Sequence, residues 1–338
     1  MSERRYEVAL VGATGAVGRE MLAILQERSF PVGTLRVMAS HRSAGKELDF
    51  GGQKVVVEDL AKADFSGVDF ALFSAGGSVS KEYAPKAAKA GAVVIDNTSA
   101  FRMDPSVPLV VPEVNPEAIK GHQGIIANPN CSTIQMVVAL KPLARDFGLS
   151  RVVVSTYQSA SGAGQSGIEE LIAGSKAYLS GEQEPQPSTF AHPLAFDALP
   201  HIDVFDPNGF TREELKMVRE TRKILEMPDL AISATCVRVP VVRCHSEAVT
   251  VDLNEEISAD EARRLWGDAP GVEVLDDPGA NEYPLARQAA STDPCWVGRI
   301  RRDLDLANTL HFWVVSDNLR KGAALNAIQI AEKLIEDQ

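Results

Sequence analysis

Short apolar stretches alternate with amphipathic stretches over the first hundred residues. Tyr6–Val11 is an apolar run typical of a strand, and the apolar positions from Ala16 to about Glu27 recur with helical periodicity. A second helix is predicted at Ser78–Ala90, with further strands at Thr34–Ser40, Lys54–Glu58, Phe70–Ala75 and Ala92–Asn97. Strands that alternate with helices at this spacing predict an α/β fold with a doubly wound parallel sheet.

The pattern changes after about residue 150. A strand at Arg151–Ser155 leads into a loop rich in glycine and serine, and two helices follow at Ile168–Ser180 and Arg212–Glu226. The stretch Leu230–Leu253 is then rich in strand-forming residues, so we expect a second, α+β domain. The last segment, Lys321–Glu336, is amphipathic and is expected to form a helix that packs on the first domain.

Size and charge exclude some classes of partner. The chain has 338 residues, which suggests two domains at about 150 residues each. Its formal net charge of −12 and its pI near 5.1 argue against nucleic acid or an anionic membrane as the main partner. Positive groups that bind an anionic substrate must therefore be local, which makes individual arginines informative.

The cysteines and the N-terminus indicate a compartment. The four cysteines, at positions 131, 236, 244 and 295, form no CxxC pair and no dense framework, which favours a reducing cytoplasm over secretion. The N-terminal residues enter a strand almost at once, without the pattern of a signal peptide. No apolar run reaches the roughly 18 residues that would span a membrane. We expect a cytoplasmic protein.

A glycine-rich loop lies between the first strand and the first helix. Its sequence, Gly12-Ala13-Thr14-Gly15-Ala16-Val17-Gly18, has GxxGxxG spacing. Glycines there permit a tight turn and let a pyrophosphate approach the helix N-terminus. The alternative is a turn that is merely tight, but the position at the first strand–helix junction favours a dinucleotide site built on Gly12, Thr14, Gly15, Ala16 and Val17.

The end of the second strand discriminates between cofactors. NAD enzymes tend to place an acidic residue there for the ribose 2′-hydroxyl, whereas a nearby arginine suits a 2′-phosphate. Here Ser40, Arg42 and Ser43 follow the strand, and no acidic residue comes before Glu47. The pattern favours NADP; the alternative is a solvated loop arginine.

Cys131 begins an amphipathic stretch. A short apolar run, Gly124 to Ala127, precedes the turn at Pro129, and a helix is predicted from Cys131 to about Phe147. The positive end of the helix dipole and unpaired backbone N–H groups favour a thiolate at that position. A small buried residue at a strand–helix junction is the alternative to a nucleophile.

The chain resembles the aspartate-β-semialdehyde dehydrogenase family. The resemblance covers nearly the whole chain in order and is carried by GATGAVG at 12–18, SAFRM at 99–103, NPNCST at 128–133, YQSASGAG at 157–164, CVRVPVVRCHSEAV at 236–249 and DNLRKGAALNAIQIAE at 317–332. It implies a Rossmann-type NADP-binding domain at 1–128, completed by a C-terminal helix at 318–338. It also implies an α+β catalytic and dimerisation domain at 129–317 and a homodimer.

The resemblance also implies a reaction. The family reduces 4-phospho-L-aspartate with NADPH to L-aspartate 4-semialdehyde and phosphate, a step toward lysine, threonine, methionine and diaminopimelate. The residues alone support part of this, because a cysteine nucleophile beside a nicotinamide site suggests aldehyde chemistry through a thioester. If the acyl group of the thioester is transferred to phosphate rather than to water, an anion-binding site must lie near Cys131.

Arg102 is the first candidate for that anion site. It follows the strand Ala92–Asn97 at its C-terminal end, where open α/β sheets place their ligand crevice. By resemblance Arg102 binds the phosphoryl group, with Asn130 beside it. The alternative is a surface arginine that satisfies loop carbonyl groups.

Two further residues take catalytic and binding roles. A lone histidine in a strand is more often structural, but by resemblance His245 is the acid–base catalyst that takes the thiol proton and serves the tetrahedral intermediate. Cys244 points to the opposite face of such a strand, so we expect no metal site. Arg238 lies in an apolar run, and by resemblance its planar fork holds the substrate carboxylate; a buried structural ion pair is the alternative.

The remaining roles come from the resemblance. Glu213 meets the substrate ammonium, Lys216 the phosphate, and Gln158 orients the substrate. Residues near the cofactor are Ser161, Gly162 and Asn318. From the residues alone, Thr211 and Glu214 form a capping box, and Glu213 with Lys216 could be only a surface ion pair.

Three other functions compete with this interpretation. N-acetyl-γ-glutamyl-phosphate reductase runs the same chemistry, but its acylated amine needs no carboxylate such as Glu213. A cysteine hydrolase would use Cys131 and His245 without the dinucleotide loop or Arg42. An inactive Rossmann regulator is disfavoured because every expected catalytic residue type is present.

Overall fold

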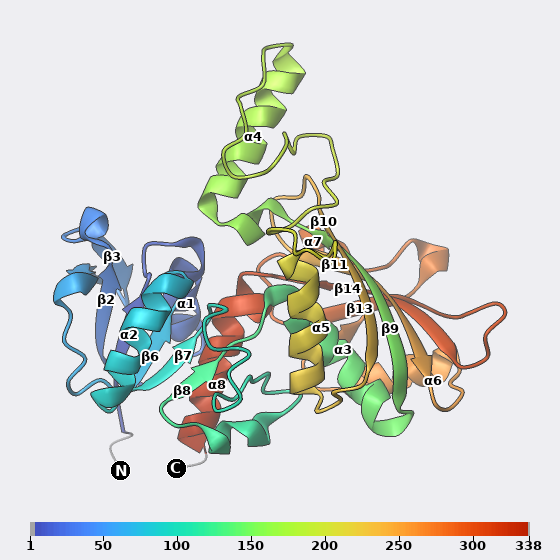
Figure 1. The fold of residues 1–338 in the computed structure, drawn as a ribbon, viewed down its shortest axis with the longest axis horizontal. Coiled ribbons are helices and arrows are strands. Elements are labelled where there is room, and N and C mark those ends of the chain that lie inside the picture. Colours follow the sequence, from blue (N-terminus) through green and yellow to red (C-terminus); the bar gives the residue numbers. More distant parts are fainter. Residues whose placement is uncertain (1–3, 337–338) are drawn as a thin grey trace. The chain divides into compact units, whose positions relative to one another are not determined.

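The computed structural model describes residues 4–336. The chain divides into two compact units, Met1–Asn130 with Ala323–Gln338, and Cys131–Gly322. Each unit contains one six-stranded sheet (Figure 1). The domain boundaries expected from the sequence, after residues 128 and 317, stay a prediction.

The first unit contains a parallel sheet. Its strand order is β5-β2-β1-β6-β7-β8, and every pairing is parallel. The order runs outward in both directions from β1, so a topological switch point lies beside β1, where ligands bind in such sheets. The strands are β1 (Tyr6–Val11), β2 (Val32–Ala39), β5 (Glu58–Asp59), β6 (Phe70–Phe73), β7 (Val93–Asp96) and β8 (Ile125–Ala127), and a hairpin adds β3 (Glu47–Phe50) and β4 (Gln53–Val56). The doubly wound parallel sheet expected from the sequence is confirmed.

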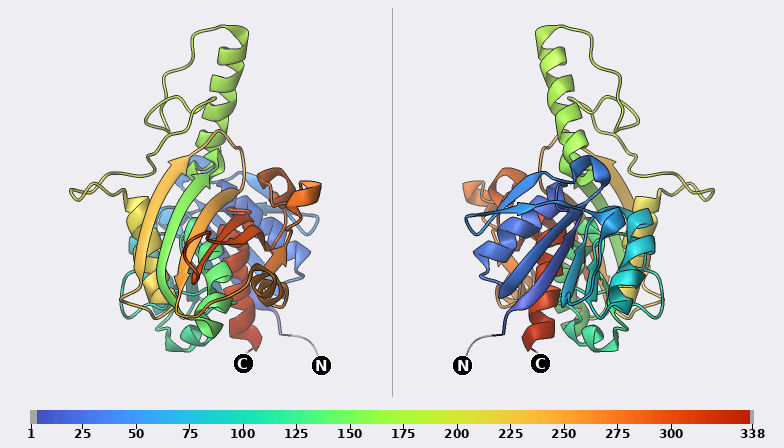
Figure 2. Two further views of the ribbon diagram at one scale, coloured as in Figure 1. Left: turned by 90° about the vertical axis from the view of Figure 1, so that its right-hand side faces the viewer. Right: turned by 90° about the vertical axis from the view of Figure 1, so that its left-hand side faces the viewer.

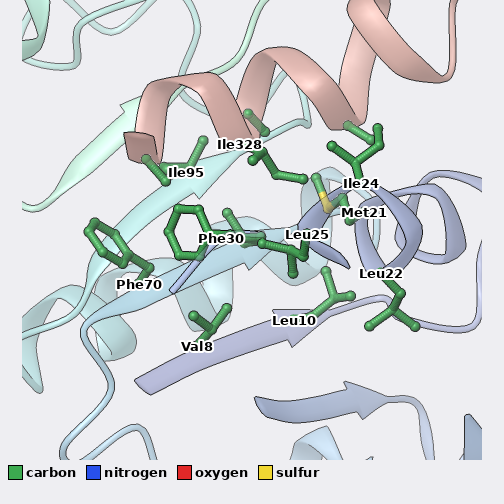
Figure 3. Close-up of a cluster of buried hydrophobic side chains, with 14 of the residues drawn as sticks. Val8, Leu10, Met21, Leu22, Ile24, Leu25, Phe30, Phe70, Ile95 and Ile328 are labelled. Carbon is green, nitrogen blue, oxygen red and sulfur yellow. The ribbon is translucent and has the colours of Figure 1, made fainter. Parts of the chain in front are cut away.

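Helices from the two ends of the chain share one core of this unit. α1 (Ala16–Glu27) and α8 (Leu325–Glu336) contact each other, and Ile24, Leu25 and Ile328 belong to one buried cluster (Figure 3). Cβ-branched and leucine side chains at helical spacing give each helix the apolar stripe that this packing needs. The expected helix Lys321–Glu336 is therefore present, although it begins with a π-helical turn at Arg320–Ala324. α2 (Gly77–Lys89) packs against β6 and β7 with a second cluster.

The second unit contains a mixed sheet of order β10-β9-β11-β14-β13-β12. Its strands are β9 (Leu149–Gln158), β10 (Ala231–Arg238), β11 (His245–Leu253), β12 (Val272–Val274), β13 (Cys295–Arg302) and β14 (Thr309–Ser316). α3 (Cys131–Asp146) and α5 (Arg212–Ile224) contact each other and the strands, and α6 (Ala259–Gly267) lies against β12 and β13. The expected α+β domain is confirmed, although the sequence reasoning missed β12, β13, β14 and α6.

α4 projects away from the strands of its own unit (Figure 2). It spans Gln165–Ser180, three residues longer at its start than expected, and ends at Gly181 in the left-handed region. Leu171 of α4 packs with Leu194 and Leu199 from the following loop. The short α7 covers Ala286–Ala289. Within residues 4–336, every helix is too short or too polar to cross a membrane.

Candidate active site

Glycines shape the loop between β1 and α1. Gly12 has a φ of +92°, and a Cβ there would lie 2.5 Å from the Ser74 carbonyl oxygen. A Cβ on Gly18 would lie 2.3 Å from the Gly12 carbonyl oxygen, so backbone excludes a side chain at both positions. The Gly12 N–H donates to the Met38 carbonyl at 2.8 Å, which ties the loop to the end of β2. α1 begins at Ala16 without a side-chain cap, so its first N–H groups can serve an anion.

The loop after β2 carries the predicted selector of the cofactor. Ser40 and Arg42 are exposed, and a short 3₁₀ turn covers His41–Ser43. Within the described residues the Arg42 guanidinium makes no ion pair. Asp59, the acidic residue nearby on β5, instead contacts His41 at 3.1 Å. Arg42 is thus exposed at the position where the sequence predicts a partner for a 2′-phosphate, and this role stays a prediction.

Arg102 lies at the carboxyl ends of β7 and β8. It is 7% exposed, and it donates from Nε to the Asn128 carbonyl at 2.9 Å and from Nη2 to the Asn97 carbonyl at 2.7 Å. Two of its N–H groups thus satisfy loop carbonyls, as one reading of the sequence expected. Asn128 in turn accepts from Asn326 Nδ2 at 2.6 Å. Asn130, in the same unit, is also buried.

Sequence reasoning did not identify this asparagine cluster. Asn97 and Asn128 directly follow two neighbouring parallel strands, and Asn326 belongs to the C-terminal helix. An asparagine placed right after an apolar strand is a recognisable signal, but only the strand order brings the three together. The cluster holds the strand ends from which Arg102 and Asn130 project.

Two predicted catalytic residues and one predicted substrate-binding residue form one row across the sheet of the second unit. Arg238, Gln158 and His245 lie in register on three neighbouring strands, and Ser316 extends the row onto β14. On the same face of the sheet, two residues further along each strand, the second row contains Cys236, Thr156, Glu247 and Val314. Another two residues along, the third row contains Ala234, Val154, Val249 and Phe312. Polarity therefore falls from the strand ends into the core within three rows. The register of four strands builds the site.

Cys131 is the first residue of α3, as the sequence predicted. It is partly exposed, whereas the three other cysteines are buried free thiols. Burial raises the pKa of Cys244 to about 12 and the pKa of Cys236 further still, so neither is a thiolate at neutral pH. A Cβ on Gly322 would come within 2.9 Å of the Cys131 Cβ, so a glycine is needed there.

His245 is buried and its tautomer is fixed. The backbone N–H of Ser159 donates to Nδ1 at 3.1 Å, so Nδ1 must carry the lone pair and the neutral ring carries its proton on Nε2. Among the described residues, Nε2 has no hydrogen-bond partner. Burial, with the positive charge of Arg238, lowers the pKa of His245 to about 3. The ring is a neutral donor in this state.

Glu213 connects the row to α5. It accepts from Gln158 Nε2 at 3.1 Å and from Lys216 Nζ at 3.0 Å, and it is 5% exposed. The pair with Lys216 is therefore not a surface ion pair. Lys216 also donates to Asp203 at 2.8 Å, a residue that sequence reasoning missed. Burial tends to lower the pKa of Lys216, but Glu213 and Asp203 outweigh it and raise that pKa. The capping box of Thr211 and Glu214 is confirmed.

Arg238 is 6% exposed and, within the described residues, makes no ion pair. Its Nη1 donates to the Ser159 carbonyl at 2.6 Å, and its guanidinium lies 5.7 Å from the Phe190 ring centre. Burial lowers its pKa, while Glu213 and Cys131 act in the opposite direction. A Cβ on Gly162 would lie 2.7 Å from Nη1, so this glycine lets the chain pass close to Arg238.

Asn318 joins two loops beside His245. Its Oδ1 accepts from the Cys244 N–H at 2.9 Å and from Ser161 Oγ at 3.0 Å. Ser161 and Gly162 belong to the 3₁₀ turn that follows β9, so the three residues expected near the cofactor lie together. Asp317, which the sequence reasoning missed, pairs with Arg243 at 2.6 Å and fixes the turn that precedes His245.

The chain matches two family models. "Semialdehyde dehydrogenase, NAD binding domain" covers residues 7–122, and "Semialdehyde dehydrogenase, dimerisation domain" covers residues 140–321. Aspartate-semialdehyde dehydrogenases of Aquifex aeolicus and Bacillus subtilis are 57% and 51% identical to it, each over 98% of both chains.

Solved structures are similar over the same length. The chain superposes on aspartate semialdehyde dehydrogenase II of Vibrio cholerae, complexed with ASA, with a TM-score of 0.97 and 49% identity, over 99% of both chains. The Candida albicans enzyme with NADP gives a TM-score of 0.76 and 27% identity over 98% of both. With its parallel NAD(P)-binding domain and its row of buried polar side chains, the chain belongs to the aspartate-semialdehyde dehydrogenase family, oxidoreductases that act on aspartate semialdehyde.

Proposed function

We propose that the protein reduces 4-phospho-L-aspartate to L-aspartate 4-semialdehyde and phosphate with NADPH, and runs the reverse reaction when phosphate and NADP⁺ are supplied. The observation that carries the proposal is the row of Arg238, Gln158 and His245, with Cys131 on the helix that packs against the same sheet. The product would supply lysine, threonine, methionine and diaminopimelate synthesis.

Cys131 is the nucleophile of this reaction. Its thiolate attacks the acyl carbon, a C–S bond forms, and the C–O bond to phosphate breaks with its electron pair leaving on phosphate. A nicotinamide cofactor, when bound, would supply the hydride that reduces the thioester. Collapse of the resulting adduct breaks the C–S bond and returns the electron pair to Sγ as thiolate. Because the thiolate is regenerated, these steps need no base to take a proton from Cys131.

His245 acts as a hydrogen-bond donor in this scheme. The Nδ1 lone pair already accepts the Ser159 N–H, so the neutral ring has no free lone pair with which to take a thiol proton. The Nε2–H is free to donate to the oxygen that becomes negative in the tetrahedral adduct. This narrows the acid–base role expected from the resemblance to stabilisation of the oxyanion.

The charged side chains recognise the two ends of the substrate. Arg238 offers its fork to the α-carboxylate, and Glu213 accepts from the ammonium group. We assign the phosphate to Lys216 and to Arg102, with Asn130 beside Arg102. Gln158, already hydrogen-bonded to Glu213, aligns the substrate with the row. Two-point contact of a carboxylate with Arg238 would hold the reacting carbon over Cys131.

NADP is the cofactor we propose. The glycine loop would hold its pyrophosphate on the start of α1, and Arg42, with Ser40 and Ser43, its 2′-phosphate. Ser161, Gly162 and Asn318 would line the nicotinamide. The relative from Candida albicans, whose structure contains NADP, supports this choice.

We also propose a homodimer in the cytoplasm. The outer face of the second sheet presents Tyr157, 39% exposed, with its ring 5.3 Å from that of Trp313. Such an aromatic face suits a subunit interface, and the family model over this region is named a dimerisation domain. The four free thiols are those of a protein in a reducing compartment.

An absorbance assay tests the proposal. The protein is mixed with L-aspartate 4-semialdehyde, phosphate and NADP⁺, and reduced nicotinamide is followed with time. We expect turnover that requires phosphate and that NAD⁺ supports poorly. Turnover without phosphate would indicate a hydrolytic dehydrogenase, and equal turnover of N-acetyl-glutamate semialdehyde would contradict the role of Glu213.

A further inference from the structure

Glu247 is a fully buried acidic residue that the proposed reaction does not use. It follows His245 by two positions on β11, faces the same side of the sheet, and lies in register with Thr156 and Val314. Its exposed fraction is 0%, and neither carboxyl oxygen has a hydrogen-bond partner among the described residues. Native structures seldom leave such a group unpaired without a reason, and the row beside it contains the proposed catalytic residues.

Among residues 4–336, no cation is found to act on the Glu247 carboxyl and stabilise a negative charge. Cys236 lies two strands away in the same row, and Glu213 approaches from α5. Burial raises the pKa of Glu247 well above its ordinary value; the nearby Gln135 amide acts in the opposite direction and the charge of Glu213 adds to the rise. Burial thus favours the un-ionised form of the carboxyl group, which can donate one hydrogen bond.

Gln135 links this acid to the nucleophile. It lies on α3 four residues after Cys131, hence one turn along the same side of the helix. α3 packs against β11, and the Gln135 side chain lies close enough to Glu247 to act on its pKa, although the two groups do not meet hydrogen-bond geometry. Gln135 is 1% exposed, and its Nε2 has no partner within residues 4–336, as is also true of Ser132 Oγ and Thr133 Oγ1. The first turns of α3 thus contain several buried polar groups without hydrogen-bond partners among the described residues.

We propose that Glu247 is a positioning residue, which supports the start of α3 against β11 by its contact with Gln135 and so aligns Cys131 Sγ for attack. The proposal rests on Cys131 being the nucleophile of the proposed function. A neutral acid supports the helix start without placing a second negative charge below the thiolate, which an ionised glutamate would do. Displacements of about 1 Å in a reacting group can cost about 100-fold in rate, so such support matters.

Two variants of Glu247 in the full-length enzyme test the proposal. Glu247→Leu removes the polar group at similar volume, and Glu247→Gln replaces the acid by a neutral group of the same shape. We expect Glu247→Leu to lower kcat by about 10- to 100-fold, with KM values for semialdehyde and phosphate changed by less than about 2-fold, because only Sγ is misaligned. We expect Glu247→Gln to restore kcat to within about 3-fold of wild type. The pH midpoint of Cys131 alkylation by iodoacetamide should rise in Glu247→Leu and not in Glu247→Gln, since the thiolate loses its alignment with the helix start.

The route through Gln135 has its own control. Gln135→Leu should also lower kcat and raise the alkylation midpoint, and its combination with Glu247→Leu should be no worse than either change alone. Additive losses would overturn that route.

A wild-type kcat and alkylation midpoint in Glu247→Leu, or a Glu247→Gln enzyme as impaired as Glu247→Leu, would overturn the proposal. If Glu247→Leu does not fold, the proposal is tested by the other two variants: kcat should stay near wild type in Glu247→Gln and fall in Gln135→Leu. Alkylation of Cys131 needs no substrate. The alkylation midpoints of the variants can therefore be compared even if the proposed reaction is wrong.

Discussion

The dinucleotide loop and the catalytic row are built in opposite ways. The loop occupies seven consecutive residues, Gly12 to Gly18, and its binding groups are backbone N–H groups exposed by glycine. The row combines side chains from β9, β10 and β11 with a helix start at Cys131, and its members are spread over more than a hundred positions. A site made of backbone can be encoded locally, whereas a site made of side chains depends on strand register.

The largest effect is expected at the nucleophile. Cys131→Ser should lower turnover by more than about 1,000-fold, because the covalent step is lost while the loop of the first unit is unchanged. NADP binding, measured by calorimetry, should stay within about 2-fold of wild type. Retention of more than about a tenth of the activity would mean that the row does not act through Cys131.

Substitution of the two arginines should affect different substrates. Arg238→Leu should lower kcat/KM for semialdehyde by about 100-fold, because the two-point contact with the carboxylate is lost. Arg238→Lys should recover little, since an ammonium group cannot make that contact. Arg102→Leu should chiefly raise the KM for phosphate. Steady-state kinetics with each co-substrate varied in turn separate the two, and a change confined to the phosphate KM in both variants would contradict the role of Arg238.

A backbone test on the loop should give a smaller, thermodynamic effect. Gly18→Ala places a Cβ 2.3 Å from the Gly12 carbonyl oxygen, so the first unit should lose about 1–3 kcal/mol of stability. Gly15→Ala is the matched control, because its Cβ would lie 3.4 Å from the same oxygen. Thermal unfolding of the two variants should differ by several degrees. Equal midpoints would show that the loop relaxes and that its glycines serve only the cofactor.

The smallest change is expected in cofactor preference. Arg42→Glu should shift the ratio of kcat/KM values for NADP and NAD toward NAD by about 10-fold, because a carboxylate accepts from the ribose hydroxyl and repels a 2′-phosphate. His41, the exposed neighbour on the same turn, offers a matched control as His41→Gln. An unmoved ratio in Arg42→Glu would make Arg42 only a loop residue.

The sequence predicted much of the first unit correctly. The limits of β1 and α1 agree with the prediction, because the apolar run and the helical period are both local signals. The start of α3 at Cys131 was likewise predicted from the turn at Pro129. The strands β13 and β14 were missed, although Pro294 directly precedes β13 and β14 is a mostly apolar run. Three arginines in the second half of β13 and the break in its register with β14 obscure the alternation that marks a strand.

Side-chain partners in the second unit were beyond the reach of the sequence. Ser159 determines the tautomer of His245 through its backbone N–H, and no residue pattern announces that contact. The hydrogen bond from Lys216 to Asp203 and the buried carboxyl group of Glu247 were missed for the same reason. Each depends on which residues share a row, and a shift of one position in strand register would turn every side chain to the other face.

The sequence by itself determined the two fold classes, the glycine loop, the cysteine at the start of a helix and the candidate side chains of the site, whose roles stay predictions. The tertiary structure alone decided that Arg238, Gln158 and His245 share a row, that His245 is a neutral donor, and that Glu247 lies in the second row, where burial favours its un-ionised form. The physical reason is the distance along the chain over which each effect acts. Backbone conformation and helix dipoles act over a few neighbouring residues, whereas hydrogen-bond partners and pKa values depend on burial and on charges brought together by distant strands.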